Sequence, residues 1–129
     1  MRRRENERGA AAVEFALLLP VLILLLLGII EFGAAYNAQI LVTNAAREAA
    51  RTMAVTGVEA DAIAAADAAL DPIGLDVTAD DIAFTVTPAG ACTSPSRLSV
   101  TLTVDKPFLT GLFGATIALS GKATRQCGG

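Results

Sequence analysis

Residues 9–36 read GAAAVEFALLLPVLILLLLGIIEFGAAY, and this stretch decides how the rest of the chain is organised. From Phe15 to Tyr36 the only charged residue is Glu31. A helix of this length measures roughly 33 Å at about 1.5 Å per residue, enough to cross a hydrocarbon core of about 30 Å. The sequence therefore predicts one membrane span over about residues 15–36, and no later segment has this apolar length.

The residues before the span carry an excess of positive charge. The basic ones are Arg2, Arg3, Arg4 and Arg8, and the acidic ones are Glu5 and Glu7. Lysine and arginine near the end of a span hold that end in the cytoplasm. We therefore expect a single-pass protein of the inner or cytoplasmic membrane, with a cytoplasmic N-terminus and the C-terminal part outside.

Composition limits the possible functions. The chain is 53% apolar with a net charge of −3; after the apolar segment it is acidic and reads as water-soluble. The few basic residues there are scattered in sequence, which argues against nucleic-acid binding. The chain has no histidine, and neither a phosphate-binding loop nor a metal-ligand cluster appears. We therefore expect no enzyme, no cofactor and no metal site, and we interpret Asp76, Asp80 and Asp81 as solvated loop residues.

The helix is expected to continue beyond the membrane, because no proline or glycine interrupts residues 34–56. Gly57 should end it, and Thr56 with Glu59 resembles a capping box for a second helix over residues 58–70. An alanine-rich stripe follows helical spacing: Ala38, Val42, Ala45, Ala49 and Met53. Its small residues suit close packing, either against neighbouring helices or against the chain's own sheet, and the sequence leaves both open.

Three later segments, residues 82–87, 98–104 and 115–126, alternate apolar and polar residues and read as half-buried strands. As an antiparallel meander they would bring Cys127 beside the 88–96 loop that holds Cys92. A disulfide would stabilise so small a domain by roughly 3 to 4 kcal/mol in the chain-entropy model, and two free buried thiols are the alternative.

The predicted fold class is α+β. It combines a long N-terminal transmembrane helix that continues outside the membrane, a short second helix and a small three-stranded antiparallel sheet tied by a disulfide. The expected domains are a basic cytoplasmic leader at residues 1–9, the long helix at 10–56 and an extracytoplasmic α+β domain at 57–129.

Three stretches, residues 7–20, 28–33 and 36–51, together resemble the TadE-like family of pseudopilins, which belong to the tight adherence (Tad) machinery that builds Flp pili. The resemblance implies a minor pilin or pseudopilin that a prepilin peptidase cuts between Gly9 and Ala10, with the apolar helix retained. It further implies that Glu14 and Phe15 serve processing or assembly. The implied partners are that peptidase, other pilins or pseudopilins and the Tad assembly platform, in a pilus used for adhesion or secretion.

Other interpretations of the N-terminus remain open at this stage. An uncleaved single-pass anchor could display a small binding domain in the cell envelope. A secretory signal peptide could instead be cut near residues 33–35, although its apolar core would be unusually long. Glu14 itself could be a solvated carboxylate that complements the dipole at the start of the helix.

Overall fold

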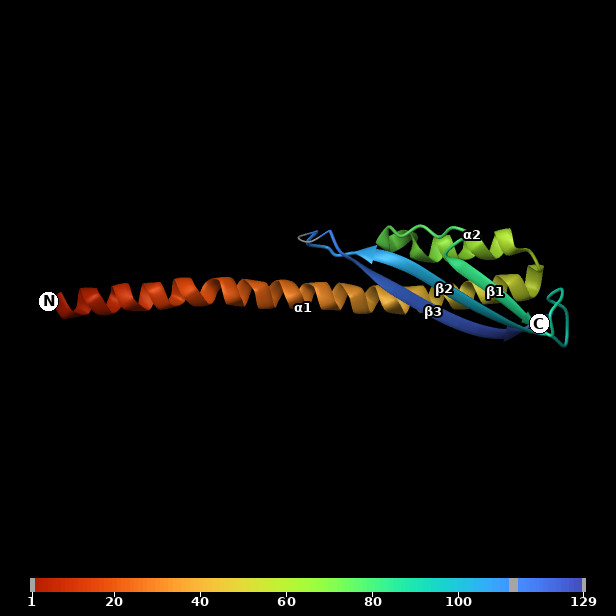
Figure 1. Cartoon of the computed structure of the whole chain (residues 1–129), viewed down its shortest axis with the longest axis horizontal. Helices are drawn as coiled ribbons and strands as arrows, with labels where there is room; N and C mark the ends of the chain where they lie inside the picture. The colour runs from red at the N-terminus through yellow and green to blue at the C-terminus, as the bar shows by residue number, and fades with distance from the viewer. Residues whose placement is uncertain (1, 112–113, 129) are drawn as a thin grey trace. The chain divides into compact units, whose positions relative to one another are not determined.

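A computed structural model describes residues 2–111 and 114–128, with side chains from residue 6 onward. Met1 of the expected leader, residues 112–113 and residue 129 lie outside this description. Figure 1 shows the elements: α1 (Arg2–Thr56), α2 (Glu59–Leu70), the 3₁₀ turn η1 (Asp71–Ile73), β1 (Ile82–Thr87), β2 (Arg97–Pro107) and β3 (Thr116–Gln126). The chain divides into an N-terminal unit, residues 1–34, and a C-terminal unit, residues 35–129, and α1 contributes to both.

The three strands form an antiparallel sheet in the order β1-β2-β3, as expected of a meander. In the centre of the sheet Val100 pairs with Phe84 on one side and with Ala123 on the other. The predicted alternation holds, because Leu98, Val100 and Leu102 are fully buried. β2 is longer than predicted and ends at Pro107, since its ladder with β3 continues to the pair Pro107 and Thr116. The α+β class is confirmed.

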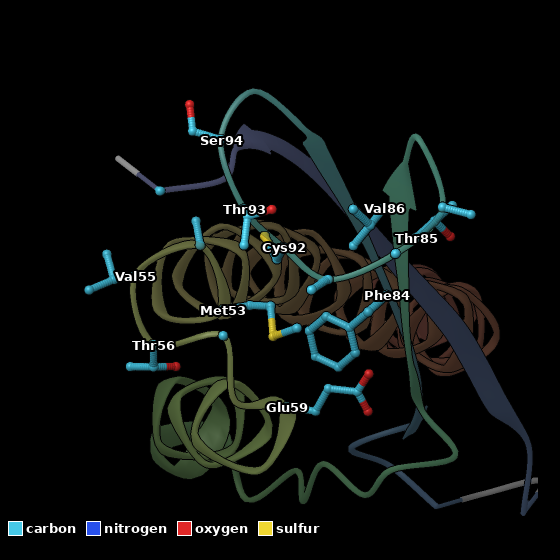
Figure 2. Close-up of a pocket in the computed structure, with 16 residues that line it drawn as sticks. Met53, Val55, Thr56, Glu59, Phe84, Thr85, Val86, Cys92, Thr93 and Ser94 are labelled. Carbon is cyan, nitrogen blue, oxygen red and sulfur yellow. The ribbon is translucent and has the colours of Figure 1, made fainter.

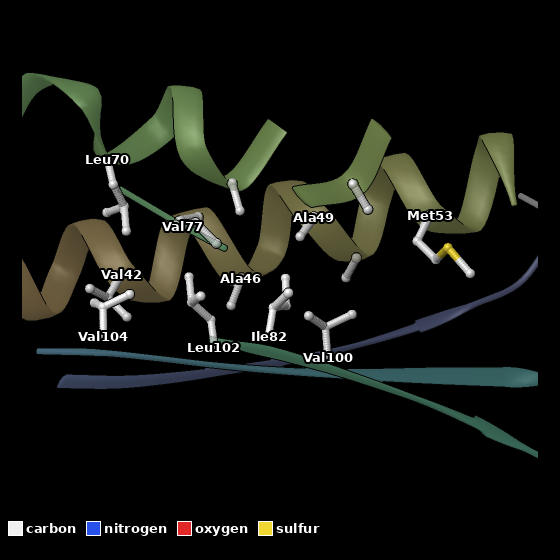
Figure 3. Close-up of a cluster of buried hydrophobic side chains, with 14 of the residues drawn as sticks. Val42, Ala46, Ala49, Met53, Leu70, Val77, Ile82, Val100, Leu102 and Val104 are labelled. Atoms are coloured by element: carbon white, nitrogen blue, oxygen red, sulfur yellow. The ribbon is translucent and has the colours of Figure 1, made fainter. Parts of the chain in front are cut away.

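The alanine-rich stripe of α1 lies in the core of the C-terminal unit. Figure 3 shows α1 between α2 and the sheet, with Val42, Ala46 and Ala49 among the buried side chains. The approach is tight at Gly121 of β3, where a Cβ atom would lie 2.7 Å from the carbonyl oxygen of Val42. Within the chain, the stripe therefore packs against both α2 and the chain's own sheet.

Two hydrogen bonds fix the direction in which α1 and β3 run. The Gln39 side-chain Nε2 donates to the Ser120 carbonyl oxygen at 2.7 Å. Farther along both elements, the Gly128 backbone N–H donates to the Ala54 carbonyl at 3.0 Å. Within the C-terminal unit, β3 therefore follows the same direction as α1, as Figure 1 also shows.

The junction of the two helices confirms one prediction and corrects another. Gly57 ends α1 with a φ of 68°, and its N–H donates to the Met53 carbonyl at 2.9 Å. The predicted capping box is wrong, because α2 begins at Glu59 and its N-cap is Val58, which makes no side-chain cap. Thr56 is still part of α1. Its hydroxyl donates to the Thr52 carbonyl at 3.0 Å and accepts the Val58 N–H at 3.1 Å.

Candidate processing segment and surfaces of the C-terminal unit

The expected cleavage point lies inside a helix. α1 begins at Arg2, so Gly9 and Ala10 are both helical, and a Cβ atom built at Gly9 would meet no other atom within 4 Å. Packing within this chain therefore does not require a glycine there. A glycine inside a helix costs about 1 kcal/mol relative to alanine, since its backbone loses more conformational freedom. The turn at Gly9 is thus easier to unwind than its alanine-rich neighbours. The boundary of the leader after residue 9 stays a prediction.

Glu14 and Phe15 are both exposed on α1, with Phe15 at 62%. Ala10 and Ala11 precede Glu14 by four and three residues, so they lie beside it on one helix face. Helical side chains tilt toward the N-terminus, which directs the Glu14 carboxylate along the turn that contains Ala10. The small alanines leave room beside this carboxylate for a second helix to approach.

The apolar side chains that follow are uncovered. Most of the large ones in the N-terminal unit are exposed, from 41% at Leu19 to 77% at Phe32, and Leu27 is half-buried. Among the described residues, one helix, Asn6–Thr56, is long and apolar enough to cross a membrane, with a mean hydropathy of 2.9 in its most apolar window. So large an exposed apolar surface needs lipid or other helices to cover it. This single apolar helix supports membrane anchoring.

The predicted disulfide is present. Cys92, in the loop after β1, is bonded to Cys127 at the end of β3, with a Cα to Cα distance of 5.2 Å. The Cys127 N–H also donates to the Ser96 carbonyl at 2.9 Å, which holds the chain beside that loop. The bridge ties the C-terminal end of the sheet to the connection between β1 and β2, and the alternative of two free thiols is wrong.

A hollow of about 970 Å³ lies next to the disulfide, formed by the end of α1, β1 and the 88–96 loop. Figure 2 shows Met53 and Phe84 on its wall with Glu59 nearby. It mixes apolar side chains with loop backbone and has one carboxylate. Among the described residues, no group of three or more His, Cys, Asp or Glu side chains could hold a metal ion.

A second hollow, of about 480 Å³, lies between α1 and β3. Its lining residues are Arg47, Glu48, Arg51, Lys122, Ala123, Thr124 and Arg125. We call it the basic groove. Of the basic residues that the sequence scatters over the C-terminal part, Lys122 and Arg125 line this hollow together with Arg47 and Arg51, because β3 runs along α1. The four-residue spacing of Arg47 and Arg51 was the one local signal of a common face.

The comparison with known families concerns one third of the chain, near its N-terminus. Residues 9–51 match the family model described as TadE-like protein. The match begins at Gly9, contains Glu14 and Phe15, and ends at Arg51, before the sheet. No curated protein and no solved structure matches the chain. The resemblance found in the sequence is therefore confirmed: over residues 9–51, this chain matches the TadE-like protein family.

Proposed function

We propose that this protein is a membrane-anchored pseudopilin or minor pilin of a Tad, or Flp-type, pilus, and that a prepilin peptidase cuts it after Gly9. One observation carries the proposal. The TadE-like match begins at Gly9 and contains Glu14, which directly precedes the long apolar run of a helix apolar enough to cross a membrane. The match and the helix together support a membrane protein related to the Tad pilus; the cut and the subunit's role are our proposal.

Hydrolysis of the peptide bond between Gly9 and Ala10 would release the arginine-rich leader and create an α-amino group on Ala10. Such a group has a reference pKa of about 8, so it is largely protonated at neutral pH. Glu14 follows four residues later on the same helix face. A charged carboxylate in the bilayer costs about 2.5 to 3.5 kcal/mol on insertion scales, and the new ammonium group, in this subunit or a neighbour, would offset that cost.

The disulfide-tied sheet favours a minor, initiating or tip position for the subunit in this proposal. Major pilins of the Flp kind are short and consist almost entirely of helix. This chain has in addition β1, β2 and β3, which lie beyond the TadE-like match. The C-terminal unit would lie outside the membrane and the N-terminus in the cytoplasm, an orientation that the arginines before the span favour.

The direct test is the mass of the mature protein. The full chain is produced in membranes with and without a prepilin peptidase, and its N-terminus is determined by intact mass spectrometry. We expect a chain that begins at Ala10 only when the peptidase is present. An intact Met1 under both conditions would instead support the uncleaved anchor, and a start near Tyr36 would support a secreted protein.

A matched pair of variants sharpens this test. Gly9→Val should block the cut, because a branched side chain replaces the glycine beside the scissile bond. Gly28→Val is the control, since Gly28 is also helical, lies within the apolar segment, and would likewise place an added Cβ atom more than 4 Å from any neighbour. Equal processing of both variants would contradict the proposed site.

A further inference from the structure

The two edges of the sheet differ in what lies against them. β3 forms one edge, and hydrogen bonds hold α1 along it at Ser120 and at Gly128, just past its end. β1 forms the other edge. In the part of the chain that the structure describes, no hydrogen bond joins β1 to either helix. The outer edge of β1 is therefore open to a further strand.

The register of the sheet shows which backbone groups of β1 face this open edge. The Thr103 N–H donates to the Asp81 carbonyl at 2.8 Å, so these residues form a hydrogen-bonded pair directly before β1. Hydrogen-bonded and non-hydrogen-bonded pairs alternate along an antiparallel ladder. Phe84 and Val86 follow Asp81 by an odd number of residues and so belong to the non-hydrogen-bonded pairs. Their N–H and carbonyl groups point away from β2.

The sequence of β1 lacks the features that keep an exposed edge from pairing. Edge strands are commonly protected by a lysine, a proline or a bulge. β1 reads IAFTVT, with no charged residue and no proline, and its branched and aromatic side chains favour a strand. Its pairing with β2 is continuous from Ile82 to Thr87, without a bulge. β1 is therefore well suited to accept a partner strand.

The hollow beside the disulfide borders the open edge. Its lining includes Phe84, Thr85 and Val86 of β1 together with Met53 of α1. Phe84 and Val86 face the core side of the sheet but are only half-buried, whereas Ile82 at the start of the strand is buried. In Figure 2 the Phe84 ring points toward Met53. We call this hollow and the outer edge of residues 84–86 the β1 edge site.

A strand added at this edge would place every second side chain over the hollow. Residues directly opposite each other in an antiparallel pair project to the same face of the sheet. The residue opposite Phe84 would therefore point to the core side, toward the wall that Met53 forms. Apolar residues at alternate positions of the added strand would cover the exposed parts of Phe84 and Val86, while its backbone bonded to theirs.

Glu59 supplies the one charge in the lining of the hollow. It is exposed at the first residue of α2, and Figure 2 shows its carboxylate on the α2 side of the hollow, near the Phe84 ring. A carboxylate at this place favours a lysine or an arginine in the added strand. β1 contains no basic residue, so two copies paired through β1 would bring no cation to Glu59. Charge complementarity therefore favours a different chain.

We propose that the β1 edge site binds an extended segment of a different protein by antiparallel strand addition. The segment carries apolar side chains at alternate positions, which enter the hollow, and a lysine or arginine that pairs with Glu59. The inference goes beyond the proposed function and does not depend on it, since every residue of the site lies in the C-terminal unit. A pilus subunit and an uncleaved anchor would use the site in the same way, to hold a partner protein.

Amide hydrogen exchange tests the site in the full chain, held in detergent micelles and followed residue by residue by NMR. The probe is the peptide acetyl-Val-Thr-Lys-Thr-Val-Thr-amide, whose valines and lysine alternate with threonine. At about ten times its Kd it should slow exchange at Phe84 and Val86 about tenfold. Exchange at Ala83 and Thr85 should change much less, because their N–H groups already bond to β2. The control peptide acetyl-Val-Val-Lys-Thr-Thr-Thr-amide has the same composition without the alternation and should protect neither pair.

Variants of Glu59 test the charge. Glu59→Gln should weaken binding of the lysine peptide about two- to fivefold, the range for an exposed ion pair. Asp61→Asn is the matched control and should leave Kd unchanged, because Asp61 is exposed on α2 but does not line the hollow. Glu59→Lys should reverse the preference, so that a peptide with glutamate in place of lysine binds better. Intact mass under non-reducing conditions and unchanged exchange in β2 verify that each variant is folded.

Several results would overturn the inference. One is the absence of protection by the lysine peptide at millimolar concentration, and another is equal protection by the peptide without alternation. Protection of β3 instead of Phe84 and Val86 would place the peptide at the other edge. Protection that grows with protein concentration in the absence of peptide would identify a second copy as the occupant. No peptidase is present in these measurements, so their outcome is separate from that of the cut after Gly9.

Discussion

Replacing Gly121 by alanine tests the packing of α1 on the sheet. The added Cβ would lie 2.7 Å from the Val42 carbonyl oxygen and 2.9 Å from the Thr43 Cα, and ordinary contacts begin at 3.4 Å. Both atoms belong to the helix backbone, so α1 or β3 must move by about 0.7 Å. Overpacking a core costs about 1 to 3 kcal/mol. The lower entropy of the unfolded chain offsets about 0.4 to 1 kcal/mol of this, so the net loss of stability is at most about 2.6 kcal/mol, and about 1 to 2 kcal/mol lies in the middle of the range.

The assay is amide hydrogen exchange of β2 in the full chain, held in detergent micelles. Leu102 pairs with Gly121 across the ladder, so its exchange reports the opening of this part of the sheet. A loss of about 1 to 2 kcal/mol accelerates exchange by a factor of about 5 to 30. The control is Ala118→Val on the exposed face of β3, where the expected change is within about 0.5 kcal/mol. Equal exchange in the two variants would refute the close approach of α1 and β3.

Three further predictions concern the other features. Glu14→Gln should leave membrane insertion intact but reduce co-purification with pilins, because the carboxylate charge is lost; Glu7→Gln is the control, and an equal yield from both would contradict the assembly role. Removing both cysteines should lower the free energy of unfolding by roughly 3 to 4 kcal/mol, as expected for a sequence separation of 35 residues. An unchanged rate of amide hydrogen exchange in β2 would contradict this. Asp67→Ala should cost about 1.5 to 3 kcal/mol, because the Asp67 Oδ1 accepts the Val77 N–H at 2.7 Å. Asp67→Asn keeps an acceptor there and should lose less stability. If thermal unfolding shows the same loss of stability for Asp67→Asn as for Asp67→Ala, the hydrogen bond is not the cause.

The elements that the sequence predicted well are those with long and regular patterns. The alternation of Leu98, Val100 and Leu102 identified β2, and the ladder confirms it. The end of α1 was predicted from Gly57, the first glycine after a long stretch without proline or glycine. Glycine readily adopts the positive φ found there. The disulfide followed from the order of the strands in the meander, since that order alone places Cys127 beside the loop of Cys92.

Features that depend on how the elements pack in three dimensions could not be predicted from the sequence. Thr56 and Glu59 have capping-box spacing, but Thr56 remains helical and its own N–H belongs to α1, so it cannot cap α2. The alanine stripe suits packing on helices and on sheets equally well, so its period could not decide between them. The basic groove arises because β3 returns along α1, which brings Lys122 beside Arg51 from a distant part of the sequence.

The parallel course of α1 and β3 has a mechanical consequence. The Gln39 side chain bonds to Ser120 near the start of β3, and Gly128 bonds to Ala54 just past its end. A pull along α1, such as the extraction of a subunit from a bilayer would apply, loads both bonds and the contact at Gly121 in shear at the same time. Bonds loaded together in shear share the force, whereas bonds that are peeled break one after another. Traction on the part of α1 that belongs to the C-terminal unit would therefore carry the sheet along with it.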